Sequence, residues 1–132
     1  MLSFITSRAN IELFDRLTEK EDITPLEVSL TDSECILKIK KTDFAYRLIK
    51  KSKVFACNTF FYQKDKEQVI CESNEGEFID KFKLCGFERI DCKAIDCSAI
   101  KKAEVMECTV TEEKEEKDYA VIKGKILTTY KA

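Results

Sequence analysis

The sequence contains no histidine and no tryptophan. Without histidine, the chain can form neither a serine–histidine or cysteine–histidine catalytic pair nor a histidine-ligated metal site. A general acid or base must therefore be a carboxylate, a lysine, a tyrosine or a thiol, or else a cofactor must carry the reaction. This absence is the strongest single restriction that the composition places on function.

Long apolar runs and an excess of one charge are also missing. The longest apolar run has about five residues, whereas a membrane helix needs roughly 20, and the beginning of the sequence lacks a signal-peptide pattern. The 23 Lys and Arg residues nearly balance the 25 Asp and Glu residues, and the net charge is −2. Nothing resembles the basic face of a nucleic-acid-binding protein. We therefore expect a cytoplasmic protein that binds neither nucleic acid nor membranes.

Cysteine is abundant, but its spacing is not that of a metal site. None of the seven cysteines forms a C-x-x-C pair. Cys92 and Cys97 are the closest two, and they lack the second tight pair that a structural zinc site uses. Most of the seven lie in apolar runs, so we expect free, buried thiols that act as small hydrophobic residues and bind no metal. A single disulfide remains open as an alternative.

The 132 residues predict one domain, residues 1–132, in which strands predominate. Alternating or continuous apolar residues predict seven strands, and the charged run 111–118 is expected at the tip of the hairpin that joins the last two. The predicted strands are 2–7, 25–30, 35–40, 54–62, 68–73, 103–110 and 119–130. No regular alternation of strand and helix is present, which argues against a parallel α/β sheet.

Two segments early in the chain have helical spacing. Apolar residues recur every three positions within 10–22, where Asn10 can cap a short helix. The period also changes to a helical one within 42–52, where Thr42 can serve as the N-cap. Both segments are therefore predicted to be helices.

A third helix is predicted over residues 76–86. Phe78, Ile79 and Phe82 fall on one helical face. Gly86 stands where a helix ends in a residue that is free to adopt positive φ. With a few short helices inserted among the strands, the prediction is a mainly β fold, a β-barrel decorated with short helices.

Five short motifs follow one another in an order that belongs to a known family. They are ITPLEVSLTD (23–32), FAYRLIKKSKVFACN (44–58), IDKFKLCGFE (79–88), AEVMECTV (103–110) and DYAVIKGKILTTY (118–130). The third is similar to a D-K-F-x-x-x-G-F helix. Together, over residues 17–130, they resemble the flavin reductase-like or flavoredoxin family, whose fold is an FMN-binding split barrel. The chain is similar to a divergent member of that family.

The resemblance implies a flavoprotein. It implies a homodimer with FMN at or near the subunit interface, and hydride transfer between NAD(P)H and the flavin N5, with the flavin doing the chemistry. The flavin ring would lie near Thr24 and Asn58. Backbone amides, with Lys41 and Thr42 nearby, would hold the phosphate. The complete set of expected cofactor-binding residues is Thr24, Lys41, Thr42, Asn58, Lys81 and Phe82.

Several positions depart from the family pattern. Glu19 and Glu21 stand where the family has Thr and Ser, and Asp22 stands in place of a Trp. Asp43 replaces a basic residue and Ala45 replaces a Thr in the region that contacts the phosphate. These changes predict weak FMN binding and little discrimination between FMN and riboflavin.

A second hypothesis of a different class follows from the same departures. The chain could be a non-catalytic dimeric split barrel that has lost tight flavin binding and serves as a ligand-binding or protein-binding module. The acidic stretch 19–22 is the feature that separates the two hypotheses. Nucleic-acid binding ranks third because of the acidic charge balance.

Overall fold

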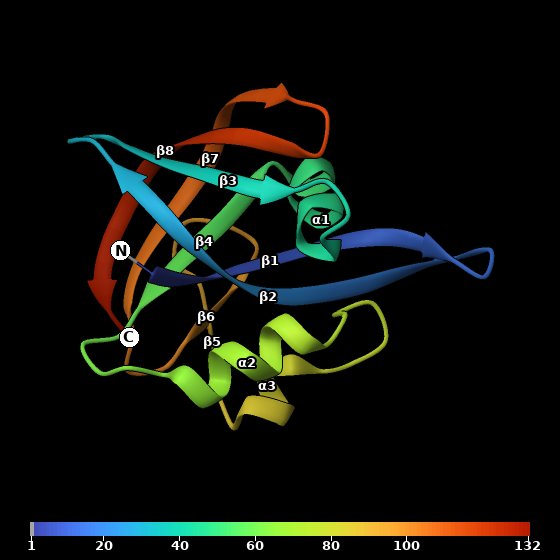
Figure 1. Cartoon of the computed structure of the whole chain (residues 1–132), viewed down its shortest axis with the longest axis horizontal. Helices are drawn as coiled ribbons and strands as arrows, with labels where there is room; N and C mark the ends of the chain where they lie inside the picture. The colour runs from blue at the N-terminus through green and yellow to red at the C-terminus, as the bar shows by residue number, and fades with distance from the viewer. Residues whose placement is uncertain (1) are drawn as a thin grey trace.

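The structure is a computed structural model that describes residues 2–132. Within these residues, six antiparallel strands form a closed barrel in the order β1-β2-β3-β8-β7-β4 (Figure 1). The barrel strands are β1 (Leu2–Leu13), β2 (Arg16–Leu30), β3 (Glu34–Lys40), β4 (Val54–Thr59), β7 (Glu104–Glu115) and β8 (Tyr119–Lys131). The predicted mainly β barrel with inserted short helices is therefore confirmed.

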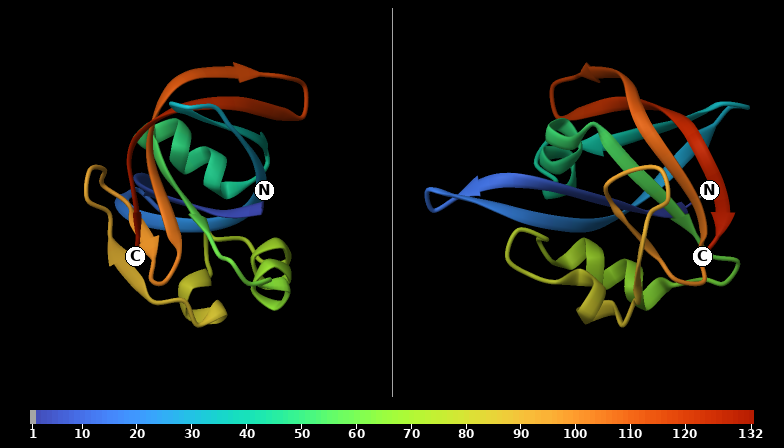
Figure 2. Two further views of the ribbon diagram at one scale, coloured as in Figure 1. Left: turned by 90° about the vertical axis from the view of Figure 1, so that its left-hand side faces the viewer. Right: turned by 180° about the vertical axis from the view of Figure 1, so that it is seen from behind.

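The remaining elements lie against the barrel. Helix α1 covers one end of it, and α2 and α3 lie together along β2 (Figures 1 and 2). They are α1 (Phe44–Ser52), α2 (Asp65–Ser73) and α3 (Lys81–Cys85), and a two-stranded sheet is formed by β5 (Arg89–Asp91) and β6 (Ser98–Ile100). Of the helices in the described part of the chain, none combines the length and the apolar composition needed to cross a membrane.

The main core fills the barrel. On β3, Cys35, Leu37 and Ile39 are fully buried, while the residues between them are more exposed, as expected for side chains that alternate between the two faces of a strand. Phe55 of β4 and Ile122 of β8 pack against this row from other walls of the barrel. A second buried cluster lies outside the barrel, beneath α2, α3 and β6.

The prediction of a helix over residues 10–22 is wrong. These residues form the hairpin of β1 and β2, in which Leu13 pairs with Arg16 around a two-residue turn. Phe14 and Asp15 occupy that turn at φ 50° and 62°. Such a turn normally contains Asn or Gly, and neither is present to signal it. The helix-like apolar spacing was misleading, because Phe14 at the tip is 88% exposed.

The prediction of a strand over residues 68–73 is also wrong, because these residues belong to α2. A short apolar run cannot be assigned by periodicity alone. Of the residues in α2, Cys71 alone is buried. The helix therefore presents a narrow apolar contact instead of the broad stripe that identifies a helix in a sequence.

The helix predicted over residues 76–86 is shorter than expected. It begins after Asp80, whose carboxylate accepts a hydrogen bond from the Lys83 amide at 3.2 Å. Phe78 and Ile79 lie in the preceding loop, 69% and 38% exposed. The end was predicted correctly, because Gly86 is the C-cap at φ 74°.

Three boundaries differ by a few residues from the prediction. Helix α1 is capped by Asp43 and not by Thr42, since the Asp43 carboxylate accepts a hydrogen bond from the Ala45 amide at 3.0 Å. Strand β4 ends at Thr59 and not at residue 62. The charged run 111–118 is mostly strand, because β7 extends to Glu115 and the hairpin turn is confined to 116–118.

Candidate functional site

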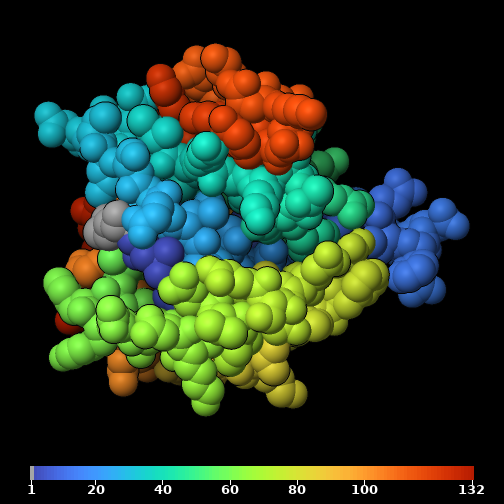
Figure 3. Space-filling model, viewed as in Figure 1, coloured from blue at the N-terminus to red at the C-terminus, as the bar shows by residue number. Residues whose placement is uncertain are grey.

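Two cavities lie beside the middle of β2. The hairpin cavity, about 920 Å³, is lined by residues of the β1–β2 hairpin, by the loop before α3 and by β5. The lysine cavity, about 910 Å³, is lined by β2, by the segment from the end of β3 to the start of α1, and by the end of α2. In the space-filling view, the surface is hollowed between the β3–α1 segment and α2 (Figure 3). Asp22 and Lys81 line both cavities and so form a shared wall.

Asp22 and Lys81 form a buried ion pair. The Lys81 Nζ lies 2.8 Å from Asp22 Oδ1, and the two side chains are 4% and 1% exposed. Lys81 also donates to the Ile23 carbonyl at 3.0 Å, and the Ile23 amide donates to Asp22 Oδ1 at 2.8 Å. Asp22 Oδ2 is buried and has no hydrogen-bond partner in the part of the chain that the structure describes. Because burial outweighs the attraction of Lys81, the pKa of Asp22 is raised to about 6.

Gly76 closes the loop before α3 over this ion pair. A Cβ at position 76 would lie 2.1 Å from Asp22 Oδ1, and contacts of this length between heavy atoms that are not bonded do not occur. The loop can therefore approach the carboxylate only because residue 76 has no side chain. The glycine thus serves the packing of the Asp22–Lys81 pair.

Asp43 occupies the start of α1 in the lysine cavity. The Thr24 hydroxyl donates to Asp43 Oδ2 at 2.6 Å, and the Ala45 amide donates to Asp43 Oδ1 at 3.0 Å. The hydroxyl and the helix N-terminus are the kinds of donors that would bind a ligand phosphate. An internal carboxylate already satisfies both of them.

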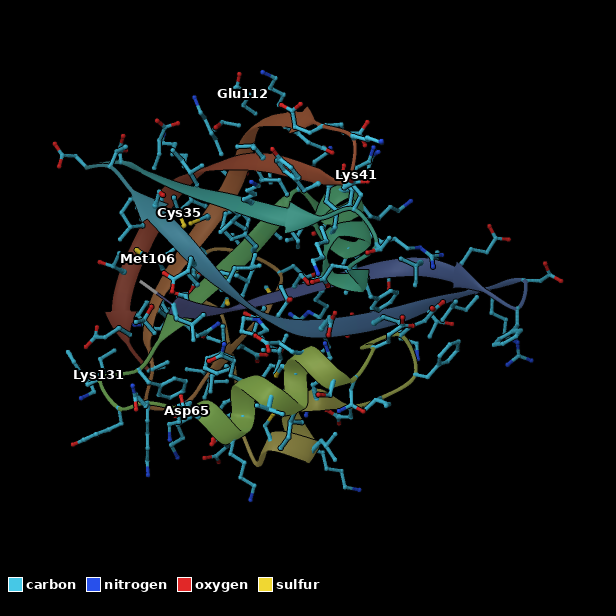
Figure 4. All side chains as sticks on the ribbon, viewed as in Figure 1. Cys35, Lys41, Asp65, Met106, Glu112 and Lys131 are labelled. Atoms are coloured by element: carbon cyan, nitrogen blue, oxygen red, sulfur yellow. The ribbon has the colours of Figure 1, made fainter. Side chains whose placement is uncertain are left out.

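The lysine cavity nevertheless carries several cationic side chains, namely Lys38, Lys40, Lys41 and Lys117. Lys38 lies 3.9 Å from the centre of the Tyr119 ring, and Lys41 donates to the Glu116 carbonyl at 3.2 Å. Figure 4 shows Lys41 just beyond the end of β3, next to α1. Asp43, Glu72, Glu75 and Asp118 line the same cavity, so its charge is mixed.

The hairpin cavity combines an apolar lining with a charged edge. Its apolar residues are Ile23, Phe78, Ile79, Phe82 and Ile90. At its edge, Ser98 donates to Glu21 Oε1 at 2.7 Å, and Arg89 forms an ion pair with Glu21 and a second one with Asp80 at 2.6 Å. The acidic stretch of β2 is therefore partly neutralised by groups from α3 and the β5–β6 sheet.

Five of the six predicted cofactor-binding residues lie on these cavities. Thr24, Lys41, Thr42 and Lys81 line the lysine cavity, and Lys81 and Phe82 line the hairpin cavity. Phe82 is also 2% exposed and belongs to the second core cluster, so it packs as a core residue as well.

Asn58 lies apart from the other predicted residues. It is fully buried, and it is not among the residues that line either cavity. Its amide nitrogen donates to the Phe4 carbonyl at 2.9 Å and to Thr6 Oγ1 at 3.0 Å, and its oxygen accepts from the Ile100 amide at 2.9 Å. These bonds join β4 to β1 and β6, so the side chain holds the fold together.

Sequence reasoning missed Arg8, Arg89 and Ser98, which form the edge of the hairpin cavity. They come from β1, β5 and β6, and no spacing in the sequence relates them. Asp22 was recognised as a departure from the family pattern, but its partner Lys81 is 59 positions away. Only the docking of α3 against β2 brings the two together.

The comparisons with known proteins place the chain by its fold. No family model matches the sequence, and neither does any curated protein. Among solved structures, a flavoredoxin from Methanosarcina acetivorans is similar over 99% of this chain, with a TM-score of 0.80 and 20% sequence identity. The flavoredoxin of Desulfovibrio vulgaris (Miyazaki F) matches 98% of the chain, with a TM-score of 0.79 and 14% identity.

An FMN-binding protein from Thermus thermophilus matches 98% of the chain, with a TM-score of 0.76 and 16% identity. The chain covers 68% of the first flavoredoxin, 69% of the second and 70% of the FMN-binding protein, so it spans about two thirds of their lengths. It covers 64% of a 2-nitrobenzoate nitroreductase from Pseudomonas fluorescens. At these identities the likeness establishes a split-barrel fold of the kind found in flavin proteins.

Proposed function

We propose that the protein binds a flavin along β2 and acts as an NAD(P)H:flavin oxidoreductase. The observation that carries the proposal is the pair of cavities that share the Asp22–Lys81 wall. They lie in a fold that flavoredoxins and an FMN-binding protein share. The absence of histidine is compatible with this proposal, because the flavin would carry the redox chemistry.

The residues present fit a flavin ring. Each cavity is within the range of about 300–1,000 Å³ that small-molecule sites occupy. The hairpin cavity offers apolar side chains for the faces of a flat heteroaromatic ring, with Phe78 among them. Arg8 offers a hydrogen-bond donor for the polar edge of such a ring, because its Nε is buried and has no partner among the described residues. A ring of this kind is therefore matched in size and in chemistry.

A phosphate group fits less well. The start of α1 and the Thr24 hydroxyl, which would bind it, are both occupied by the carboxylate of Asp43. A carboxylate about 5–6 Å from a phosphate charge opposes it by about 3 kcal/mol at an effective dielectric constant of 20. The lysines of the lysine cavity can offset part of this repulsion. We therefore propose that the ring contributes most of the binding free energy, and that FMN and riboflavin bind with similar affinity.

A bound flavin would supply hydride exchange with NAD(P)H. The protein's own contribution lies in the shared wall of the two cavities. Lys81 holds a fixed positive charge there, which favours electron-rich ring atoms. Asp22 lies beside it with a raised pKa and an unpartnered oxygen, so it can exchange a proton near neutral pH.

Flavin fluorescence can test the proposal with a matched pair of variants. Phe78→Ala removes an exposed ring from the hairpin cavity, whereas Leu84→Ala removes an exposed apolar side chain that lines neither cavity. We expect Phe78→Ala to weaken riboflavin binding roughly two- to tenfold, as the loss of an aromatic contact does. Leu84→Ala should leave it unchanged. Equal affinities of wild type and both variants would contradict the proposed ring site.

A second candidate function has one observation in its favour. Asp22 and Asp43 already satisfy Lys81, Thr24 and the start of α1 from within the protein. A site whose polar groups are satisfied internally suits a non-catalytic split barrel that binds another ligand or a protein. Purified protein that quenches neither FMN nor riboflavin fluorescence at millimolar flavin would favour this candidate over the oxidoreductase.

A further inference from the structure

Three cysteine side chains meet inside the barrel. Cys35 of β3, Cys57 of β4 and Cys108 of β7 are each fully buried, and their Sγ atoms all lie within 4.8 Å of one another. The Cys35 and Cys57 sulfurs are 3.2 Å apart. Figure 4 labels Cys35 on β3, with its side chain directed into the barrel. The three residues are far apart in the sequence, so no spacing motif reveals the group, which we call the thiol trio.

The barrel topology brings the trio together. Strands β3 and β4 are not neighbours in the sheet, because β8 and β7 lie between them. Gly124 of β8 is paired with Cys35. A Cβ at Gly124 would lie 2.6 Å from the Phe55 ring and 3.0 Å from the Cys108 Cβ. The missing side chain on β8 therefore leaves room for the Phe55 ring and for Cys108, one of the three cysteines.

The surroundings of the trio determine which ion it could hold. Thiolates are soft ligands that select ions such as Cu(I) and zinc. A metal with three sulfur ligands at about 2.3 Å places those sulfurs about 4 Å apart. The three sulfurs lie within 4.8 Å of one another, and the Cys35 and Cys57 sulfurs, which are 3.2 Å apart, would move apart by about 0.8 Å to hold the ion. Among the described residues, no carboxylate joins the group as a fourth ligand. Structural zinc is almost always four-coordinate, so a three-coordinate soft ion fits better.

We propose that Cys35, Cys57 and Cys108 form a binding site for one Cu(I) ion held by three sulfur ligands. One sulfur binds as a thiolate and releases its proton to solvent, and the single positive charge of Cu(I) neutralises it; the other two sulfurs bind as neutral thiols, so no net charge is left in the apolar core. The trio does not line either cavity, so the site is separate from the flavin site and does not depend on the proposed function. For these three cysteines the proposal differs from the sequence prediction that the cysteines bind no metal, and the copper titration decides between the two.

The alternative is that the three thiols only fill space as small hydrophobic side chains. Packing alone requires no ion. It predicts that replacing one of these three cysteines changes the Cu(I) affinity no more than replacing any other cysteine does. Because the trio is closed off from solvent, the ion must enter during local opening or during folding. Copper should therefore be offered both to the folded protein and during refolding.

The test is a Cu(I) titration of the reduced protein without oxygen, in competition with a chromophoric Cu(I) chelator. We expect the first equivalent to bind at the trio, and the variants Cys35→Ala, Cys57→Ala and Cys108→Ala each to lower its affinity by about tenfold or more. Cys71→Ala is the control, because Cys71 lies 3.6 Å from Cys85 in a separate thiol pair. The control should keep the wild-type affinity for the first equivalent.

A second measurement covers the case in which the variants do not fold. X-ray absorption at the copper edge, on wild-type protein with one equivalent of Cu(I), counts the ligands directly. Three sulfur neighbours would support the site. Two sulfur neighbours, mixed nitrogen and oxygen ligands, or no uptake by either loading route would overturn it. Equal loss of affinity in Cys71→Ala and in the trio variants would overturn it as well.

Discussion

Asp22 is a single residue whose chemistry depends on a distant partner. In the sequence it is one carboxylate in an acidic stretch, where a solvated side chain is the ordinary expectation. In the structure it is buried against Lys81 and Gly76, and one of its oxygens has no partner among residues 2–132. A sequence shows which groups can ionise, but their pKa values depend on burial and on contacts that come from other elements.

The raised pKa of Asp22 predicts a specific dependence of stability on pH. Burial raises this pKa from the ordinary aspartate value of 3.8 to about 6 in the folded protein. The folded protein therefore holds this proton more tightly than the unfolded chain does. The contribution of Asp22 to stability is fully present below pH 3.8 and is lost as the pH rises through 6. A shift of this size corresponds to about 3 kcal/mol.

The variant Asp22→Asn removes this titration. We expect the free energy of unfolding of wild type, relative to Asp22→Asn, to fall by about 2–2.5 kcal/mol between pH 4 and pH 7. Urea denaturation of both proteins across this range is the measurement. Asp32→Asn, at an exposed position, is the control for the change in net charge and should follow wild type. Parallel curves for wild type and Asp22→Asn would show that the burial of Asp22 has no such effect.

Among the elements, the strands were largely predictable and the connections were not. The apolar residues Cys35, Leu37 and Ile39 at every second position, with lysines at 38 and 40, are enough to identify β3 and its inner face from the sequence. The β1–β2 hairpin was missed because its turn at Phe14 and Asp15 lacks the Asn-Gly, Asp-Gly or Gly-Gly pair that usually marks a two-residue hairpin turn. Helix α2 was missed because its apolar contact is too narrow to set a period.

Strand β7 also anchors the loop before β6 through Glu107. The Glu107 carboxylate is buried and accepts hydrogen bonds from the amides of Lys93 at 2.7 Å, Ala94 at 2.6 Å and Ile95 at 3.2 Å, and from the Tyr130 hydroxyl. Burial alone would raise the pKa of Glu107, but these donors lower it. The stability that this group contributes is therefore present above its usual pKa of 4.5 and is lost as the pH falls through the lower folded value.

Replacing this carboxylate by an amide should destabilise the protein. In Glu107→Gln, an NH₂ group replaces one of the two carboxylate oxygens that accept hydrogen bonds from the loop amides and from Tyr130, so some of these donors lose their acceptor. We expect a loss of about 2–3 kcal/mol in the free energy of unfolding at pH 7. Glu104→Gln, at an exposed position on the same strand, should change it by no more than about 0.5 kcal/mol. Urea denaturation measures both. If the two variants were equally stable, Glu107 would not anchor the loop.

For the whole molecule, the sequence predicted the barrel better than the site. Strand content and the order of five motifs were enough for the fold class. The site depends on packing between elements, which the sequence does not show. This packing places Lys81 against Asp22, and it buries Asn58 in hydrogen bonds that join strands instead of at a cavity. The thiol trio could not be predicted either, because its members meet in the barrel but form no motif in the sequence.

We predict that the protein is a homodimer in solution. The family resemblance implies a dimer, and the loop after β4 exposes two neighbouring aromatic rings, since Phe61 and Tyr62 are each 81% exposed. An interface that buries more than about 1,000 Å² in total would be credible for a specific dimer. Light scattering at micromolar concentration should give twice the chain mass of 15.3 kDa. A particle with the mass of one chain would contradict the prediction.

The central claim is that the cavities beside β2 hold a flavin through its ring, while Asp43 occupies the place of its phosphate. The most direct measurement is a fluorescence titration with FMN and with riboflavin, for wild type and for Asp43→Ser. Serine keeps a hydroxyl cap for α1 but removes the carboxylate. Asp32→Ser, outside both cavities, is the charge control.

Wild type should bind the two flavins with similar affinity. Asp43→Ser should bind FMN about tenfold to hundredfold more tightly, because up to about 3 kcal/mol of repulsion is removed. Its affinity for riboflavin should not change, and Asp32→Ser should behave as wild type. Wild-type protein that purifies yellow, with one tightly held FMN per chain, would contradict the claim.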